Sequence, residues 1–186
     1  MLTQEALAFL VFHPKQKAPH ALTNLFLERF VHEIVSQSSQ SDLWMRFFGI
    51  PNVETITGRI TGRIADPYEQ SRDTVIVAFE NRRPVGYADI ARLSEQADRA
   101  EIAMLVRSDR QRRGIGKAMM QAVIQASRKE GVKQLEAYVH PENIKMQGAL
   151  QKWSRMEEMR DVTFRKTFRE GEIVYTIDLG AKNSTR

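Results

Sequence analysis

The residues best suited to chemistry lie between Val106 and Lys117, in the run V-R-S-D-R-Q-R-R-G-I-G-K. Gly114 and Gly116 follow a basic stretch there and precede a long amphipathic segment. Glycines let a backbone approach a ligand closely, and the first N–H groups of a helix have no partners within it. The positive end of the helix dipole adds to their attraction for an anion. The pattern therefore predicts a strand-to-helix turn that binds a group such as a pyrophosphate.

Two other nucleotide-binding motifs fail on spacing. A P-loop requires a glycine at position 111 and a Ser or Thr after Lys117, where this chain has Gln111 and Ala118. A dinucleotide fingerprint requires a third glycine three residues after Gly116, and Met119 occupies that position. The remaining alternative to an anion site is a plain tight turn with solvated arginines.

The composition narrows the classes of protein to which the chain can belong. Its 186 residues suit one domain, and 28 basic against 23 acidic side chains give a net charge of +5. Such a surface suits an anionic cofactor, nucleic acid or an acidic protein equally well. The chain has no cysteine, which excludes disulfides, cysteine-based zinc sites and a covalent thiol intermediate.

The start of the chain, M-L-T-Q-E-A-L-A-F-L-V-F, is apolar but short and carries Glu5. It lacks the basic leader and the cleavage site of a signal peptide, so we interpret it as part of the fold. No run reaches the ~20 apolar residues of a membrane span. We therefore expect a cytoplasmic protein with no membrane partner.

The elements that must position the turn follow from hydrophobic spacing. From Ala21 to Val35 an apolar stripe predicts a helix that buries Leu22, Leu25, Phe26, Phe30 and Ile34. A second short helix is expected at 43–48, and the repeated T-G-R-I at 57–64 favours a helical turn or two. Strands are expected at 74–80, 85–93, 100–106 and 135–139, helices at 116–130 and from about 143, and a hairpin at 162–168 and 172–179. The order predicts a mixed α/β sheet without a domain boundary.

This order of elements, from about residue 20 to the end, resembles the GNAT superfamily of N-acetyltransferases, and the [RQ]-x-x-G-x-G spacing at 111–116 resembles their acetyl-CoA loop. The segment 100–120 and the W-M-R-F-F-G at 44–49 resemble the acetyltransferase domain of bacterial protein-lysine acetyltransferases. The resemblance implies a single GNAT domain over 1–186, with a mixed central sheet and helices on both faces. Within this domain, the resemblance implies acceptor-side helices at about 20–48, a CoA-binding core at about 74–155 and a C-terminal hairpin at about 162–179.

The resemblance also implies acetyl-CoA as cosubstrate. Met104, Leu105 and Val106 would offer main-chain groups to its pantetheine arm. Asn143 would hold the end of that arm, and the alternative for it is a helix N-cap. The pyrophosphate would lie within the residues Gln111, Arg112, Arg113, Gly114, Ile115, Gly116 and Lys117. Arg107 and Arg110 are expected to be solvated charges.

The expected chemistry is direct attack of an amine on the thioester. A lysine ammonium has a pKa near ~10.4, so a base must remove a proton, and by resemblance this base is Glu101. Glu136 and Tyr138 share one side of the neighbouring strand and are the alternatives, although such alternation is ordinarily a solvent face. A backbone N–H near Leu105 would stabilise the oxyanion. Leu150 occupies the position where many relatives have a tyrosine that protonates the leaving thiolate.

The sequence therefore predicts an acetyl-CoA-dependent N-acetyltransferase that acts on a protein lysine or N-terminus. A small-amine acetyltransferase and a CoA-binding module without catalysis are the alternatives. Nucleic acid ranks behind these, because charge runs such as Arg165, Lys166 and Arg169 are usually solvated faces and the chain has no recognised nucleic-acid motif. The four histidines have no spacing that suggests a metal site. The oligomeric state is open, a homodimer included.

Overall fold

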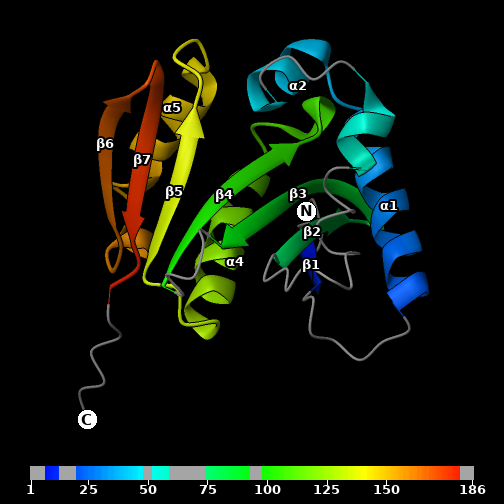
Figure 1. The fold of residues 1–186 in the computed structure, drawn as a ribbon, viewed down its shortest axis with the longest axis horizontal. Coiled ribbons are helices and arrows are strands. Elements are labelled where there is room, and N and C mark those ends of the chain that lie inside the picture. Colours follow the sequence, from blue (N-terminus) through cyan, green and yellow to red (C-terminus); the bar gives the residue numbers. More distant parts are fainter. Residues whose placement is uncertain (1–6, 13–19, 48–51, 59–73, 93–97, 181–186) are drawn as a thin grey trace, which may run out of the picture.

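A computed structural model describes residues 7–12, 20–47, 52–58, 74–92 and 98–180 (Figure 1). The strands are β1 (Leu7–Phe12), β2 (Thr74–Glu80), β3 (Arg83–Arg92), β4 (Arg99–Val106), β5 (Gln134–Val139), β6 (Thr163–Arg169) and β7 (Glu172–Asp178). The helices are α1 (His20–Ser36), α2 (Gln40–Phe47), α4 (Ile115–Lys129) and α5 (Ile144–Trp153), with one-turn 3₁₀ helices at Ser108–Arg110 and Glu157–Met159. Residues 53–58 form a further short helix.

The strands form one sheet of seven in the order β1-β2-β3-β4-β5-β7-β6. β4 and β5 are parallel, and the other neighbours are antiparallel. The helix α4 provides the crossover that a parallel pair requires. The parallel register covers only Arg99 with Gln134, Ala100 with Leu135 and Glu101 with Glu136. The sheet is therefore two antiparallel blocks joined by one short parallel pairing.

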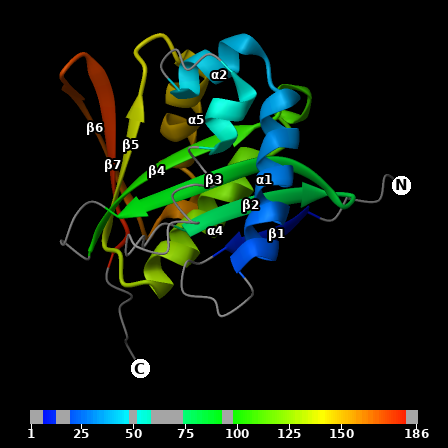
Figure 2. The ribbon, with the colours of Figure 1, turned by 45° about the vertical axis from the view of Figure 1, so that its right-hand side comes forward.

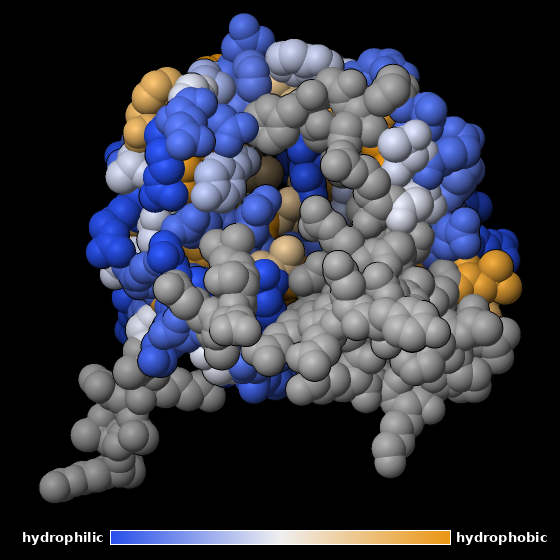
Figure 3. Space-filling view, in the orientation of Figure 1, coloured by the Kyte–Doolittle hydropathy of each residue, from blue (hydrophilic) through white to orange (hydrophobic). Residues whose placement is uncertain are grey.

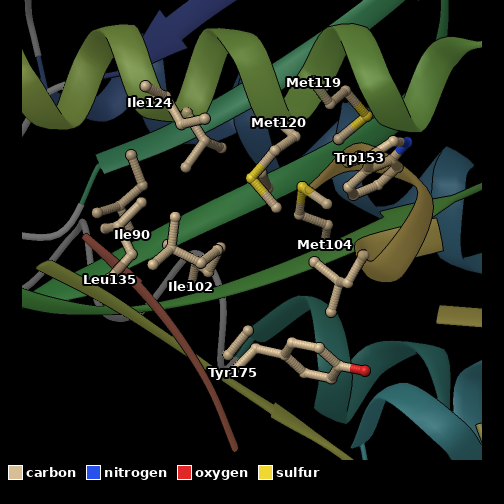
Figure 4. Packing of buried hydrophobic residues seen from close by; sticks show 14 of the residues in the cluster. Ile90, Ile102, Met104, Met119, Met120, Ile124, Leu135, Trp153 and Tyr175 are labelled. Atoms are coloured by element: carbon tan, nitrogen blue, oxygen red, sulfur yellow. The ribbon is translucent and has the colours of Figure 1, made fainter. Parts of the chain in front are cut away.

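Helices cover both faces of this sheet (Figure 2). On one face, α4 places Met119, Met120 and Ile124 against strand residues that include Ile90 and Ile102 (Figure 4). On the other face, α1 and α2 pack on a second cluster that contains Tyr87 and Leu105. Because side chains alternate along a strand, residues of β4 divide between the two clusters. The predicted mixed sheet with helices on both faces is confirmed.

The buried face of α1 differs from the predicted stripe. Leu25 and Phe26 are 61% and 52% exposed, whereas Leu27 and Val31 are fully buried together with Ile34, the one of these that was predicted. Both sets have helical spacing, so periodicity alone could not choose between them. The choice is made by the sheet, because α1 packs over β3.

Three boundaries also differ from the prediction. The apolar start of the chain is an edge strand, β1, paired antiparallel with β2. α2 begins at Gln40 instead of 43, because the Ser39 hydroxyl accepts a hydrogen bond from the Asp42 N–H at 3.2 Å and caps the helix. The hairpin between β2 and β3 turns on Asn81 and Arg82 alone, both with positive φ, so Pro84 lies within β3. The second T-G-R-I copy and the segment 59–73 lie outside the described residues.

Within the described ranges, no helix combines the length and the apolar content that crossing a bilayer requires.

Gly86 of β3 provides a test of packing between the sheet and α4. An added Cβ would lie 2.8 Å from the Met119 sulfur and 2.9 Å from the Leu105 carbonyl oxygen, and the second contact is with backbone. We expect Gly86→Ala to lower the free energy of unfolding by about 1–3 kcal/mol, as overpacking does. Urea denaturation followed by circular dichroism measures this change.

Gly148→Ala is the matched control. Gly148 lies within α5 and an added Cβ there meets nothing within 4 Å, so alanine should stabilise the helix by about 0.5–1 kcal/mol. Equal effects of the two substitutions would contradict the close packing at Gly86.

Candidate active site

The central feature of the site is the point at which β4 and β5 separate. Their register ends at Glu101 and Glu136, while β4 stays paired with β3 and β5 with β7. Figure 1 shows the two strands spreading apart beyond that point, and Figure 3 shows the same face of the molecule hollowed there. The last part of β4 therefore has an open edge.

Two of the predicted residues direct main-chain groups to this open edge. The Arg107 N–H donates to the Val85 carbonyl of β3 at 2.9 Å, and groups along an antiparallel pair alternate in direction. The odd-numbered residues of β4, Leu105 among them, therefore direct their main chain to β3. Met104 and Val106 direct theirs away from β3, toward the opening.

The turn after β4 presents the first N–H groups of α4. Gly114 is the N-cap residue and has a φ of 85°, which glycine adopts without strain. The first helical hydrogen bond runs from the Ala118 N–H to the Gly114 carbonyl at 3.1 Å. The N–H groups between these residues have no partner within the helix and are free to bind an anion. The predicted strand-to-helix turn is confirmed.

The two glycines of this turn have different requirements. A Cβ at Gly114 would meet no atom within 4 Å, so the positive φ alone requires glycine there. A Cβ at Gly116 would lie 3.5 Å from the Trp153 ring, an ordinary van der Waals contact, and no positive φ applies. The shape of the turn therefore depends on Gly114 and tolerates alanine at 116.

Asp42 of α2 ties this turn to two other elements. Its Oδ2 accepts hydrogen bonds from the Ser108 hydroxyl at 2.6 Å and from the Gln111 amide at 2.9 Å. Its Oδ1 pairs with the Lys145 ammonium of α5 at 3.3 Å. Burial alone would raise the pKa of Asp42, but hydrogen bonds from Ser108, Ser39 and Lys145 outweigh it and hold the pKa below its ordinary value. One carboxylate thus joins α2, the turn and α5.

Sequence reasoning missed Asp42. The S-x-x-D spacing from Ser39 to Asp42 is a capping pattern and would have indicated a helix start. It contains no information about Ser108 and Gln111, which are more than 60 residues away along the chain. The predicted site residue Gln111 is therefore placed by a partner that only the tertiary structure identifies. Its amide also donates to the Val106 carbonyl at 3.2 Å.

The basic residues of the turn divide into one buried anchor, Arg107, and several more accessible charges. Arg107 was expected to be solvated, but it is 7% exposed and donates to the Asp109 carboxylate and to the Pro84 carbonyl. It is buried because the end of β4 lies against the β2–β3 hairpin. Arg110 and Arg113 both lie within ion-pair distance of Glu80, at 3.5 and 3.2 Å.

The other two basic residues of the turn are Lys117 and Arg112. The Lys117 ammonium forms an ion pair with the Glu158 carboxylate at 3.1 Å. The Arg112 side chain is exposed, and its backbone has a positive φ of 63°.

Asn143 has the role of helix cap that was the alternative for it. Its Oδ1 accepts a hydrogen bond from the Met146 N–H at 3.1 Å at the start of α5. Two residues later, Lys145 reaches Asp42, so the start of α5 lies beside the predicted turn. Leu150, at the position where a tyrosine was considered, is 1% exposed and belongs to the core.

The predicted base Glu101 lies on the face of the sheet that α1 and α2 cover. It is half-buried and in register with Glu136, which is almost completely buried and bonded to Arg99. The Tyr138 hydroxyl donates to Glu136 at 2.9 Å. Burial and this hydrogen bond raise the pKa of Tyr138. The expectation of an ordinary solvent face at Glu136 is wrong, because Glu136 is buried among the side chains of Arg99, Tyr138 and Arg169.

Two contacts connect α2 to the rest of this face. Arg46 binds Asp89 of β3 at 2.7 Å, and the Trp44 ring lies edge-on to His140, with centroids 4.8 Å apart. His140 follows the end of β5, so the second contact crosses the mouth of the opening between β4 and β5. In the part of the chain that the structure describes, no group of three or more His, Cys, Asp or Glu side chains could hold a metal ion.

The family follows from comparison with known sequences. The model of the acetyltransferase (GNAT) family matches residues 37–154, more than half of the chain. The chain belongs to this family. The expected GNAT fold is confirmed, and the matched range contains α2, the turn after β4, Glu101 and Asn143. No curated protein sequence matches the chain.

Solved structures of low sequence identity share the fold. The GNAT domain of S. lividans PAT matches with a TM-score of 0.67 and 19% identity, over 94% of this chain and 96% of that one. The PaiA N-acetyltransferase from Thermoplasma acidophilum in complex with coenzyme A matches with a TM-score of 0.59 and 13% identity, over 92% and 98%. The aminoglycoside acetyltransferase AAC(6')-Ib in complex with coenzyme A matches with the same score and identity, over 93% and 94%.

The contacts that the Asp42 carboxylate makes with the turn and with α5 can be tested through the pH dependence of stability. We expect Asp42→Asn to lower the free energy of unfolding at pH 7 by about 1–3 kcal/mol, because the amide loses the charge-assisted hydrogen bonds. A carboxylate whose folded-state pKa is depressed contributes stability above its ordinary pKa near ~3.9 and loses that contribution as the pH falls through the folded value. The difference between the variant and the parent should therefore shrink below pH ~4 in urea denaturation series.

The control for this series is Asp161→Asn. Asp161 is 59% exposed and pairs only at the surface with Arg128, so its loss should cost little at any pH. If the loss of unfolding free energy in Asp42→Asn stayed constant down to pH 3, the contacts of Asp42 would not depend on its ionised carboxylate.

Proposed function

We propose that this protein is an acetyl-CoA-dependent N-acetyltransferase whose acceptor is a primary amine of a protein, either a lysine side chain or an N-terminus. The observation that carries the proposal is the separation of β4 from β5 beyond Glu101, with the turn at Gly114 directly after β4. Family membership supports the reaction class. The resemblance of residues 44–49 and 100–120 to protein-lysine acetyltransferases supports the acceptor.

In this proposal the cofactor lies in the opening between the two strands. Main-chain groups of Met104 and Val106 bind the pantetheine arm, since these face the open edge of β4, while those of Leu105 serve the ladder to β3. The N–H groups of the turn at 111–117 bind the pyrophosphate, with Gly114 fixing their direction. Asn143 caps α5 through its Oδ1 and retains its amide N–H groups for the pantetheine end.

The reaction requires a base, an oxyanion donor and a leaving thiolate. Glu101 removes a proton from the amine, directly or through a water, and the amine nitrogen attacks the thioester carbon. A main-chain N–H at the open edge, of Met104 or Val106, stabilises the oxyanion in place of Leu105. The carbon–sulfur bond then breaks and the electron pair leaves on sulfur. A thiolate with a pKa near ~8.5 is a tolerable leaving group, which suits a site with Leu150 at the tyrosine position.

The nearest rival is acetylation of a small amine. The face around Glu101 contains the carboxylates of Asp89 and Glu136, but Arg46 and Arg99 pair with them. Because arginines neutralise these carboxylates, the face has little net negative charge with which to bind a polycation. A single lysine ammonium on a peptide requires less negative charge, and we therefore favour a protein acceptor.

A CoA-binding module without catalysis is the second candidate, and Leu150 favours it. Because this side chain is 1% exposed in the core, α5 presents no proton donor at that position. Tight CoA binding together with absence of transfer to every acceptor would select this function over the enzyme.

The experiment that decides among these is an acceptor screen. The protein is incubated with acetyl-CoA and a panel of lysine peptides, free N-terminal peptides, whole proteins and small amines. Thiol release and mass spectrometry detect transfer. We expect a mass increase of one acetyl group on peptide or protein amines, and acetylation confined to small amines would overturn the protein acceptor.

Glu101→Gln tests the base. We expect turnover to fall about 10²–10⁴-fold, the range of general-base catalysis, while calorimetry shows unchanged affinity for CoA. Glu157→Gln, a substitution of a side chain that is 78% exposed, serves as control and should leave both quantities unchanged. Normal turnover in Glu101→Gln would remove this residue from the mechanism.

Gly114→Ala tests the pyrophosphate turn. Alanine is strained at a φ of 85°, so the turn must shift and its N–H groups lose their direction. We expect the KM for acetyl-CoA to rise about 10-fold, since misdirected charge-assisted hydrogen bonds of ~1.4 kcal/mol correspond to that factor. Gly116→Ala is the control and should leave KM near the parent value, and a larger effect at 116 than at 114 would contradict this account.

A further inference from the structure

The motif W-M-R-F-F-G at 44–49 contains a partly buried cation, Arg46, that the proposed mechanism does not use. Arg46 lies in the last turn of α2, and its side chain is 19% exposed. Its Nη2 binds Asp89 Oδ1 of β3 at 2.7 Å, and Asp89 itself is 14% exposed. A buried guanidinium stays charged at every pH at which the protein is folded.

The register of the sheet brings the base candidate next to this pair. Asp89 lies opposite Ala103, and Ala91 lies opposite Glu101, so Asp89 and Glu101 are diagonal neighbours on one face. Diagonal neighbours on a sheet are ~7–8 Å apart, within reach of one long side chain between them. Arg46, fixed on Asp89, therefore lies beside Glu101.

Arg46 is attracted by the acidic groups on this face of the sheet, Glu101 among them. Burial alone would lower the pKa of Arg46, but Asp89, Tyr87 and Glu101 outweigh it and raise that pKa. The same attraction acts on Glu101 in the opposite sense, because a cation favours the ionised form of a carboxylate. Among the described residues, the other titratable or charged groups around Glu101 are Asp89 and Tyr87 of β3, Arg99 of β4, Glu136 and Tyr138 of β5, and Arg169 of β6.

We propose that Arg46 is a positioning residue for the catalytic base, and that its guanidinium, held by Asp89, keeps the neighbouring Glu101 carboxylate ionised. The proposal rests on the proposed role of Glu101. Without Arg46, Glu101 would lie between the carboxylates of Asp89 and Glu136, and like charges favour the protonated form. A protonated glutamate cannot accept the proton of the amine.

Two substitutions that should move the titration midpoint of Glu101 in opposite directions test this proposal. Carbon-13 NMR follows the Glu101 carboxyl carbon through a pH titration, and the signal is assigned by its loss in Glu101→Gln. Arg46→Gln removes the cation and should raise the titration midpoint by ~1 pH unit or more. Asp89→Asn removes the competing anion and should lower the midpoint. Destabilisation of the fold by either variant would not produce shifts of opposite direction.

Arg46→Lys is the conservative control and should keep the midpoint near that of the parent protein. If Arg46→Gln does not fold, as judged by circular dichroism, Arg46→Met, which keeps an unbranched stem and removes the charge, replaces it with the same expected rise of the midpoint. A midpoint that does not move in Arg46→Gln, or shifts of the same sign in Arg46→Gln and Asp89→Asn, would overturn the role of Arg46 alone.

Kinetics separate this proposal from the proposed function. With a peptide acceptor, the acidic limb of the pH profile of kcat/KM should move with the NMR midpoint in each variant. Full turnover in Glu101→Gln would remove the glutamate from the reaction and overturn the base assignment together with this proposal. Loss of turnover in Glu101→Gln with unmoved midpoints would leave the function intact and overturn only the part played by Arg46.

Discussion

The site depends on a parallel pairing of β4 with β5 that ends after three residue pairs. Each strand has an antiparallel neighbour on its other side, so the two halves of the sheet are stable without a longer join. A continued ladder would consume the main-chain groups of Met104 and Val106 in hydrogen bonds to β5. Because the ladder ends, β5 leaves these groups unused at an edge that lies directly before the turn at Gly114, where the Val106 carbonyl accepts a hydrogen bond from the Gln111 amide instead. Separation of two strands thus creates both walls of the opening.

The helix α2 is the element that joins the two sides of this opening. Near its start, Asp42 holds Ser108 and Gln111 of the turn and Lys145 of α5. Near its end, Arg46 holds Asp89 on the face that also contains Glu101. These are polar contacts of partly buried groups, which depend on geometry more than apolar packing does. A shift of α2 would therefore affect the turn at Gly114 and the surroundings of Glu101 together.

Much of the fold was predictable because its signals are local. The alternation in β5, the stripe on α4 and the positive-φ turn at Gly114 depend on residues within a few positions of one another. Predictions were wrong where two patterns of equal quality competed or where the partner was distant. Leu25 and Leu27 both fit a helical stripe, and only the contact with β3 chose Leu27. The strand β1 was not predicted, since an edge strand is defined by its pairing with β2, more than 60 residues later.

By itself, the sequence determined the family, the glycine turn between β4 and α4 and the position of Glu101 on the strand that leads into it, because a glycine turn and its flanking elements are encoded in one continuous segment. The tertiary structure alone decided which main-chain groups are free, that Arg107 is a buried anchor, and that Asp42 and Arg46 hold the site. These facts depend on register and on side chains from distant segments. Hydrogen bonds and ion pairs act over a few ångströms in space, and the chain order contains no record of those distances.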